Sequence, residues 1–456
     1  MASLRGYYLR MWRYGAETEK YVQEALERES WSSERWDNWQ RERLAFVLHR
    51  AATRVPYYRN MWRRRRVAGD KRSHEYLENW PVLEKECVRN NPRSFVADDC
   101  DTRWMFREHT SGTTGKPLSL WWSLETVRKW YALFEARCRR WYGVSLHDRW
   151  AIIGGQLVTS VDKRDPPFWV WNWAMNQLYM SSYHLAPDLI DHYLRALDDY
   201  RIHFLFGYSS SLYELAQGVL KSGKCLTPRV VVTNAEPLYD YQRDVISRAF
   251  RCPVRQTYGM AEIVATASEC MCGRMHLWPD LGMVEVCNGE ENVEDERSGD
   301  LVCTGLLNSD MPLIRYRIGD SGTLSESGDV CGCGRRMPIL KSVEGRSDDL
   351  IYTVDGKRVG RLDPVFKGEL PIKNAQIIQD SFDSIRVLLV PSSGYSENVG
   401  RLISQRLQER VGPAKIIIER VHEIQRQSNG KYKGVINNMR VASHRSGEKC
   451  DHELQK

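Results

Sequence analysis

The central part of the chain alternates short apolar runs with segments of helical period, and this rhythm constrains the fold more than any other feature. The apolar runs are 151–155, 203–206 and 230–233, and helical segments such as Ser210–Lys221 and Tyr239–Phe250 follow them. Strands that alternate with helices form a mostly parallel sheet with crossover helices. The sequence therefore predicts an α/β fold, in which ligands bind beyond the carboxyl ends of the strands.

Two short polar stretches fall at strand ends of this kind. The first is Asn234–Pro237, directly after the 230–233 run, and the second is Thr257–Glu262. Because parallel strands end at the same edge of a sheet, side chains of both stretches are expected near a ligand. Topology alone makes them candidate parts of a binding site.

The regions on either side of the predicted sheet have different patterns. Glu17–Arg66 is rich in Trp and Arg at helical spacing and predicts a helical cap, whereas short strands and turns beyond Cys270 predict a small antiparallel layer. With 456 residues and 42% hydrophobic content, the chain is long enough for one large core and a second domain. We place a large N-terminal domain at 1–347, a small mobile α+β domain at 348–442 and a polar tail at 443–456, with the hinge at Asp348.

The charge balance argues against some classes of protein. The chain has 66 basic and 59 acidic residues, and the dense basic run Arg63–Arg66 is typical of a solvated helix face rather than a phosphate-binding patch. We therefore expect no nucleic-acid partner. Arg5, Arg10 and Arg13 interrupt any apolar start, and no run of 18 apolar residues occurs, so we expect neither a signal peptide nor a membrane span. The expected location is cytoplasmic.

A stretch rich in glycine and hydroxyl side chains, His109–Pro117, precedes a strand-like run. Gly112 and Gly115 relieve backbone crowding, so that amide N–H groups can turn toward phosphate oxygens. The order of residues is not that of a Walker loop. The stretch predicts a site for ATP phosphates, with an ordinary Gly/Thr hairpin as the alternative. Hydroxyl donors and one positive charge would come from Ser111, Thr113, Thr114 and Lys116.

Cysteines and a histidine gather in two parts of the chain, with Cys270, Cys272 and His276 in one part and Cys331 and Cys333 in the other. A tetrahedral zinc ion takes four such ligands, and zinc fits this donor set best. We expect Cys270, His276, Cys331 and Cys333 to be the ligands, with Cys272 as the substitute. Four protein ligands would leave no open position, so the ion would be structural. Free thiols are the alternative, because disulfides are rare in a reducing compartment.

Five motifs, taken in chain order, resemble those of adenylate-forming enzymes. They are Ser111–Pro117, Tyr258–Glu262, Tyr316–Asp320, Gly345–Asp349 and Asn429–Lys431. Within that superfamily the chain is similar to phenylacetate-CoA ligases and their capsular-polysaccharide (CapK-like) relatives, on the cues Val55–Arg59, Gly207–Ser210, Gly360–Asp363 and Ala375–Gln379. The resemblance implies a large α/β adenylation domain with a small mobile domain after it.

The resemblance also implies how ATP and magnesium would bind. The 111–117 loop would hold the β and γ phosphates, and Glu262 would bind a magnesium ion that bridges phosphates, because a hard cation prefers carboxylate oxygen. Tyr258 would stack on adenine, and Asp320 would accept hydrogen bonds from the ribose hydroxyls. A core aromatic and a turn residue are the respective alternatives for these two. The other implied ATP-site residues are Ala235, Glu236, Gly259 and Arg346.

Lys431 is the implied catalytic residue, together with Glu262. Joining a carboxylate to AMP gathers negative charge on the transferring phosphoryl group, and Lys431 would bridge the α-phosphate and the carboxylate substrate. Lys433 is the main rival for this role, and a solvated charge in a Gly turn is the alternative for Lys431.

These roles predict an AMP-forming ligase that uses ATP and magnesium to convert a small carboxylic acid into an acyl-adenylate, whose acyl group passes to a nucleophile. Gly360–Asp363 and Ala375–Gln379 resemble the capsular-polysaccharide branch more than phenylacetate ligase, which favours an amine acceptor over coenzyme A. The alternatives are an acyl-CoA ligase of the phenylacetate-CoA ligase type and a catalytically inactive, zinc-containing nucleotide-binding module. The sequence does not identify the acid.

Overall fold

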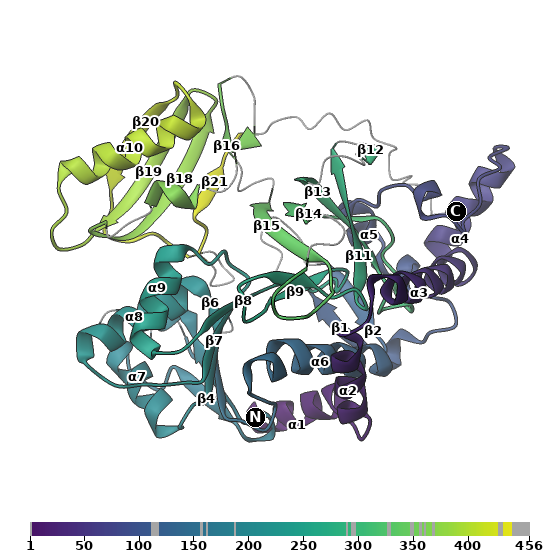
Figure 1. The fold of residues 1–456 in the computed structure, drawn as a ribbon, viewed down its shortest axis with the longest axis horizontal. Coiled ribbons are helices and arrows are strands. Elements are labelled where there is room, and N and C mark those ends of the chain that lie inside the picture. The colour runs from purple at the N-terminus through teal and green to yellow at the C-terminus, as the bar shows by residue number, and fades with distance from the viewer. Residues whose placement is uncertain are drawn as a thin grey trace. The chain divides into compact units, whose positions relative to one another are not determined.

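A computed structural model describes residues 2–110, 118–155, 158–160, 163–186, 188–288, 291–292, 298–325, 330–346, 351–354, 358–359, 362–366, 370–426 and 432–439 (Figure 1). The chain divides into two compact units, Met1–Val343 with Gln427–Tyr432, and Glu344–Arg426 with Lys433–Lys456. Six residues with predicted roles lie outside the described ranges, namely Ser111, Thr113, Thr114, Lys116, Asp348 and Lys431.

The larger unit is built on one sheet, and the strands toward one side of this sheet are parallel. The parallel strands are β5 (Gln177–Ser181), β3 (Trp150–Gly154), β6 (Phe204–Tyr208), β7 (Val230–Asn234) and β8 (Val254–Gly259), with β4 (Trp169–Asn172) as the antiparallel edge. Helices α7 (Ile190–Asp199), α8 (Ser209–Ser222) and α9 (Asp240–Phe250) bury Leu194, Leu215 and Phe250 in the core that these strands line. Figure 1 shows these helices beside the strands. Runs of Val, Ile and Phe suit strands that are buried on both faces, and the predicted α/β fold is confirmed.

The antiparallel strands expected beyond Cys270 extend this sheet instead of forming a separate small layer. After β8 the order is β9 (Thr266–Glu269), β10 (Met275–Leu277), β15 (Ile339–Arg346), β14 (Tyr316–Leu324), β13 (Ser298–Gly305), β11 (Gly282–Asn288) and β12 (Glu291–Asn292). The join occurs at β8, because this strand pairs in parallel with β7 and antiparallel with β9.

Helices from the N-terminal part of the chain pack into the core beside the antiparallel strands. They are α1 (Ala2–Arg13), α2 (Thr18–Arg28), α3 (Ser33–Arg54), α4 (Pro56–Val67) and α6 (Leu124–Cys138). Helix α3 ends at Arg54 because Pro56 disfavours a helical conformation at Val55, which has a ψ of 117°. Pro56 then occupies the first position of α4, where its missing N–H costs no hydrogen bond.

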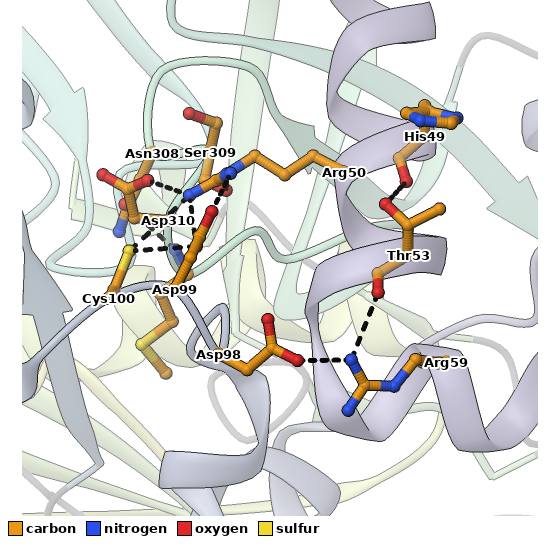
Figure 2. Close-up of polar contacts among 11 residues, drawn as sticks. His49, Arg50, Thr53, Arg59, Asp98, Asp99, Cys100, Asn308, Ser309 and Asp310 are labelled. Atoms are coloured by element: carbon orange, nitrogen blue, oxygen red, sulfur yellow. Dashed lines mark hydrogen bonds and ion pairs between the residues drawn. The ribbon is translucent and has the colours of Figure 1, made fainter.

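Ion pairs fasten α3 and α4 to loops of the same unit (Figure 2). The Arg50 guanidinium on α3 contacts Asp99 at 2.9 Å and Asp310 at 2.8 Å. Arg59 on α4 contacts Asp98. Because the fork of an arginine side chain bonds two oxygens of Asp99 at once, the direction of the contact is fixed as well as its distance.

The remaining elements of the larger unit are short. They are α5 (Lys85–Asn90), the antiparallel pair β1 (Phe106–His109) and β2 (Ser119–Trp122), and 3₁₀ turns at Leu77–Asn79, Pro92–Phe95, Thr102–Trp104, Arg140–Tyr142, Trp173–Met175 and Ser182–His184. Across the described parts of the chain, no helix combines the length and apolar character needed to cross a membrane.

The smaller unit is an α+β domain with its own core. Its sheet has the order β20 (Lys415–Arg420), β19 (Ser384–Pro391), β18 (Ile372–Ser381) and β21 (Val435–Asn437). Helix α10 (Glu397–Val411) buries Ile403 and Leu407 in the same core as Val387 and Leu389 of β19. Two short strands, β16 (Ile351–Tyr352) and β17 (Arg358–Val359), and a 3₁₀ turn at Asp363–Phe366 complete it. A small domain after the large one is confirmed.

Candidate functional site

The turn after β7 places two predicted residues at the carboxyl end of the parallel strands. Ala235 has a φ of 61°, a left-handed conformation that is uncommon for a residue other than glycine. Glu236 is buried, and its Oε2 accepts the N–H of Ser210 at 3.0 Å and the hydroxyl of Ser209 at 3.3 Å. Its Oε1 accepts a hydrogen bond of 2.6 Å from the N–H of Tyr432, which belongs to the same unit. The positive end of α8 thus favours the Glu236 carboxylate, which holds the turn in place.

Tyr258 and Asp320 come from separate strands, β8 and β14, and meet in the structure. The Tyr258 hydroxyl donates a hydrogen bond to Oδ2 of Asp320 at 2.7 Å. Gly259 ends β8, and a Cβ atom at this position would lie 3.1 Å from the hydroxyl of Thr266 on the neighbouring strand. The pair offers an aromatic face next to a carboxylate acceptor, which is the combination that a base and its ribose require.

Glu262 lies beyond β8, and its side chain is only 5% exposed. The Nζ atom of Lys85 lies 2.8 Å from its Oε1, and the Tyr316 hydroxyl donates to the same oxygen at 3.0 Å. Among the described residues, Oε2 has no hydrogen-bond partner. A carboxylate with one oxygen fixed and the other open suits a hard cation.

Two members of this cluster, Lys85 and Tyr316, have no role in the sequence predictions. Tyr316 is the first residue of the Tyr316–Asp320 motif, so the motif could have pointed to it. Lys85 gives no local signal, because 177 positions separate it from Glu262. Arg346 is the last residue of β15, and its role stays a prediction, as do those of the residues outside the described ranges.

A second cluster brings together Cys270, His276, Cys331 and Cys333, whose ligand atoms all lie within 4.8 Å of one another. The Sγ atoms of Cys270 and Cys331 are 3.6 Å apart, and Sγ of Cys333 is 3.4 Å from Nε2 of His276. Cys270, His276 and Cys331 are buried. Three sulfur atoms and one imidazole nitrogen are the donor set that zinc prefers.

Contacts around the cluster orient His276. Burial lowers the pKa of His276 to about 4, so the ring is neutral near pH 7. Its Nδ1 lies 3.3 Å from the carbonyl oxygen of Met337, and a proton on Nδ1 leaves the Nε2 lone pair facing the sulfur atoms. Cys272 is exposed and is not one of the four clustered residues. It lies in a turn from Cys270 to Gly273, which a 3.0 Å backbone hydrogen bond closes.

The chain is similar to known proteins along most of its length. Residues 351–438 match a family described as the CapK C-terminal domain. The chain is 25% identical to Protein CapK of Staphylococcus aureus over 391 residues, which are 84% of this chain and 85% of that protein. It is 26% identical to the phenylacetate-coenzyme A ligase of Thermus thermophilus over 340 residues, or 68% of this chain and 70% of that protein.

The fold also matches a solved structure of 2-hydroxyisobutyryl-CoA ligase in the postadenylation state, bound to R3-HIB-AMP. The TM-score is 0.67 at 19% identity, over 90% of this chain and 91% of that one. The chain belongs to the superfamily of adenylate-forming ligases. Within it, the chain is a homologue of CapK and of the phenylacetate-CoA ligases, as its motifs predict.

Proposed function

We propose that this protein is an AMP-forming acid–coenzyme A ligase, which activates a carboxylic acid with ATP and magnesium and then forms a thioester. The observation that carries the proposal is the contact between Tyr258 and Asp320, with Glu262 close by in the sequence and buried. Two relatives whose names state an acceptor are the phenylacetate-coenzyme A ligases of Thermus thermophilus and Escherichia coli. The amine acceptor favoured by the motifs has no such support, so coenzyme A takes its place as the expected acceptor.

The first half of the proposed reaction forms an acyl-adenylate. A carboxylate oxygen of the acid attacks the α-phosphorus of ATP, and the bond to pyrophosphate breaks. Tyr258 supplies the face on which adenine stacks, and the Asp320 carboxylate accepts hydrogen bonds from the ribose hydroxyls. A carboxylate has about four lone-pair positions, so the hydrogen bond from Tyr258 leaves Asp320 able to accept more.

The charge that gathers during this step needs cations. Magnesium, when bound, would neutralise part of the negative charge on the phosphates. Glu262 is the residue that would hold it, through Oε2, while Lys85 and Tyr316 fix Oε1. We keep Lys431 as the residue that bridges the α-phosphate and the acid. In the second half, the thiol of coenzyme A attacks the acyl carbonyl, its proton is lost to solvent, and AMP leaves.

The second cluster has a separate role in this proposal. Cys270, His276, Cys331 and Cys333 would hold one zinc ion through their four ligand atoms. A zinc ion with four protein ligands has no open position for a substrate, so it would stabilise the fold without taking part in the reaction.

The test is a two-stage assay on the purified chain. The first stage measures exchange of labelled pyrophosphate into ATP with a panel of aryl and aliphatic acids. The second stage adds coenzyme A, or a panel of amino acids and amino sugars, to the acyl-adenylate of the best acid and measures AMP release. Asp320→Ala serves as the comparison, because it loses the ribose acceptor.

We expect pyrophosphate exchange with at least one acid, and AMP release that saturates with the concentration of coenzyme A. Both rates should be strongly reduced in Asp320→Ala. Amide formation with no thioester would restore the amine as the acceptor. Nucleotide binding without any exchange across the whole panel would favour the inactive nucleotide-binding module instead.

A further inference from the structure

The ion pair between Lys85 and Glu262 places a fixed positive charge on the candidate metal ligand. The two side chains are 27% and 5% exposed, and the distance from Nζ to Oε1 is 2.8 Å. Exposed ion pairs add little to stability, but this carboxylate has been removed from water. Its cationic partner therefore influences what else the carboxylate can bind.

Backbone contacts with β14 fix the position of Lys85. The Leu83 N–H donates to the carbonyl oxygen of Arg315 at 2.8 Å, and the Arg317 N–H donates to the carbonyl oxygen of Leu83 at 3.0 Å. Lys85 begins α5 two residues later. Asp320 lies on β14, so the chain that leads into α5 is anchored to the strand that also carries the candidate ribose acceptor.

Lys85 and Tyr316 both bond to Oε1 of Glu262, so they leave the carboxylate half occupied. A metal ion at Oε2 would lie within a few ångströms of the Lys85 ammonium. Two cations at that separation repel each other strongly where little water screens them. A free metal ion therefore finds a carboxylate whose charge is already largely neutralised.

A bound triphosphate outweighs the repulsion between the metal ion and the Lys85 ammonium. It carries more negative charge than one metal ion neutralises, so a metal ion and an ammonium group can both lie against it with net attraction. We propose that Lys85 makes the Glu262 site selective for a metal–triphosphate complex over the free metal ion. This inference rests on the proposed function, since it takes ATP as the occupant.

The test compares two affinities of the full chain as purified. Calorimetry gives the affinity for magnesium–ATP, and the electron paramagnetic resonance signal of unbound Mn²⁺ gives the affinity for the metal alone. Glu262→Gln measures Mn²⁺ binding elsewhere on the chain. Lys85→Met removes the charge, Lys85→Arg keeps it, and Lys129→Met is the matched control, because it breaks a Lys–Glu pair of 2.5 Å with Glu125 on α6.

In Lys85→Met we expect the affinity for magnesium–ATP to fall about tenfold or more, as when other metal ligands lose an outer partner. Mn²⁺ alone should bind to this variant as well as to wild type, or more tightly. Lys85→Arg and Lys129→Met should stay close to wild type in both affinities. Lys85→Met should unfold at a lower temperature than wild type, because its buried Glu262 carboxylate keeps only the hydrogen bond from Tyr316, so both affinities are measured well below that temperature.

Selectivity is the readout that a merely structural role would not change. If a folded Lys85→Met protein loses both affinities by the same factor, or neither, the inference about Lys85 is wrong while the proposed function stands. If wild type does not bind magnesium–ATP at all, the proposed function itself fails, and the inference fails with it.

Discussion

The Tyr258 hydroxyl lies 2.7 Å from Oδ2 of Asp320, and this hydrogen bond joins two strands that are not neighbours in the sheet. Strands β9, β10 and β15 lie between β8 and β14. Four strand spacings in a flat sheet would separate the two backbones by about 19 Å. The antiparallel part of the sheet must therefore curl, and the curl brings a motif from each end of the β8–β14 segment into one site.

The first prediction separates the hydroxyl of Tyr258 from its ring. Tyr258→Phe keeps the ring but loses the hydrogen bond to Asp320, so AMP binding should weaken by about 1 kcal/mol, roughly fivefold. Tyr258→Ala also loses the stacking face, which should cost a further 1–3 kcal/mol or so. Calorimetric titration with AMP measures both. Tyr76→Phe, at an exposed tyrosine, is the control, and equal affinities of Tyr258→Phe and Tyr258→Ala would exclude stacking.

The second prediction concerns Lys431, which is assigned to the transition state. Lys431→Ala should reduce pyrophosphate exchange by about 100-fold or more while ATP still binds, because the lysine would act mainly on charge that develops during the reaction. Lys433→Ala is the matched control. The Lys433 carbonyl oxygen accepts a 2.7 Å hydrogen bond from Gln376, and this backbone contact survives the substitution. A severe loss in Lys433→Ala with a mild one in Lys431→Ala would reverse the assignment.

The parallel half of the fold is predictable from sequence, and the antiparallel half less so. The runs at 151–155, 203–206 and 230–233 correspond to β3, β6 and β7, and α8 and α9 directly follow β6 and β7 in the chain. In the antiparallel half, β15 inserts between β10 and β14. No local sequence pattern encodes pairing between segments so far apart in the chain. The sequence therefore predicts that these strands exist but not their order in the sheet.

The candidate site shows the same division. Tyr258, Glu262 and Asp320 lie in short motifs whose residue types match their proposed chemistry. Lys85 reaches Glu262 only through the fold, so no spacing in the sequence could indicate it. Cys-x-Cys spacing likewise leaves open whether Cys272 is a ligand. In the structure Cys272 lies outside the cluster of four ligand atoms, in a turn that ends at Gly273, whose φ of 77° favours glycine.

The third prediction tests the buried charges of the larger unit. Arg137 on α6 is fully buried and contacts Asp280 at 2.6 and 3.0 Å and Glu29 at 3.4 Å. Burial would raise the pKa of Asp280, but the Arg137 guanidinium holds it below its usual value, so the pair stays ionised. Arg137→Met leaves the buried Asp280 carboxylate without its closest partner, whereas Glu29 keeps its contact with Arg335 at 2.8 Å. We expect the free energy of unfolding to fall by about 3–5 kcal/mol, measured by chemical denaturation.

The control for this prediction is Arg164→Met, which removes an exposed ion pair with Asp188. Exposed pairs contribute about 1 kcal/mol or less, so this variant should unfold near the wild-type denaturant concentration. If Arg164→Met and Arg137→Met lose similar free energies of unfolding, burial does not make the Arg137–Asp280 pair more important for stability than an exposed pair.

The fourth prediction is that the purified chain carries close to one zinc ion and that the ion stabilises folding. Cys331→Ser removes one of four clustered ligands and should lower both the zinc content and the unfolding temperature. Any folded fraction should keep most of its rate of pyrophosphate exchange, because a closed tetrahedral site offers no position to a substrate. Elemental analysis, thermal unfolding and the exchange assay measure the three quantities.

Cys272→Ser is the matched control, since Cys272 is exposed and lies outside the ligand cluster. It should keep both the zinc and the unfolding temperature of wild type, whereas a strong chelator should lower the unfolding temperature of wild type and Cys272→Ser alike. If untagged wild-type protein contains no zinc and its unfolding temperature does not respond to the chelator, the four residues form a cluster of buried and half-buried donors without a metal. If Cys272→Ser loses the ion instead of Cys331→Ser, the ligand set would need Cys272 in place of Cys331.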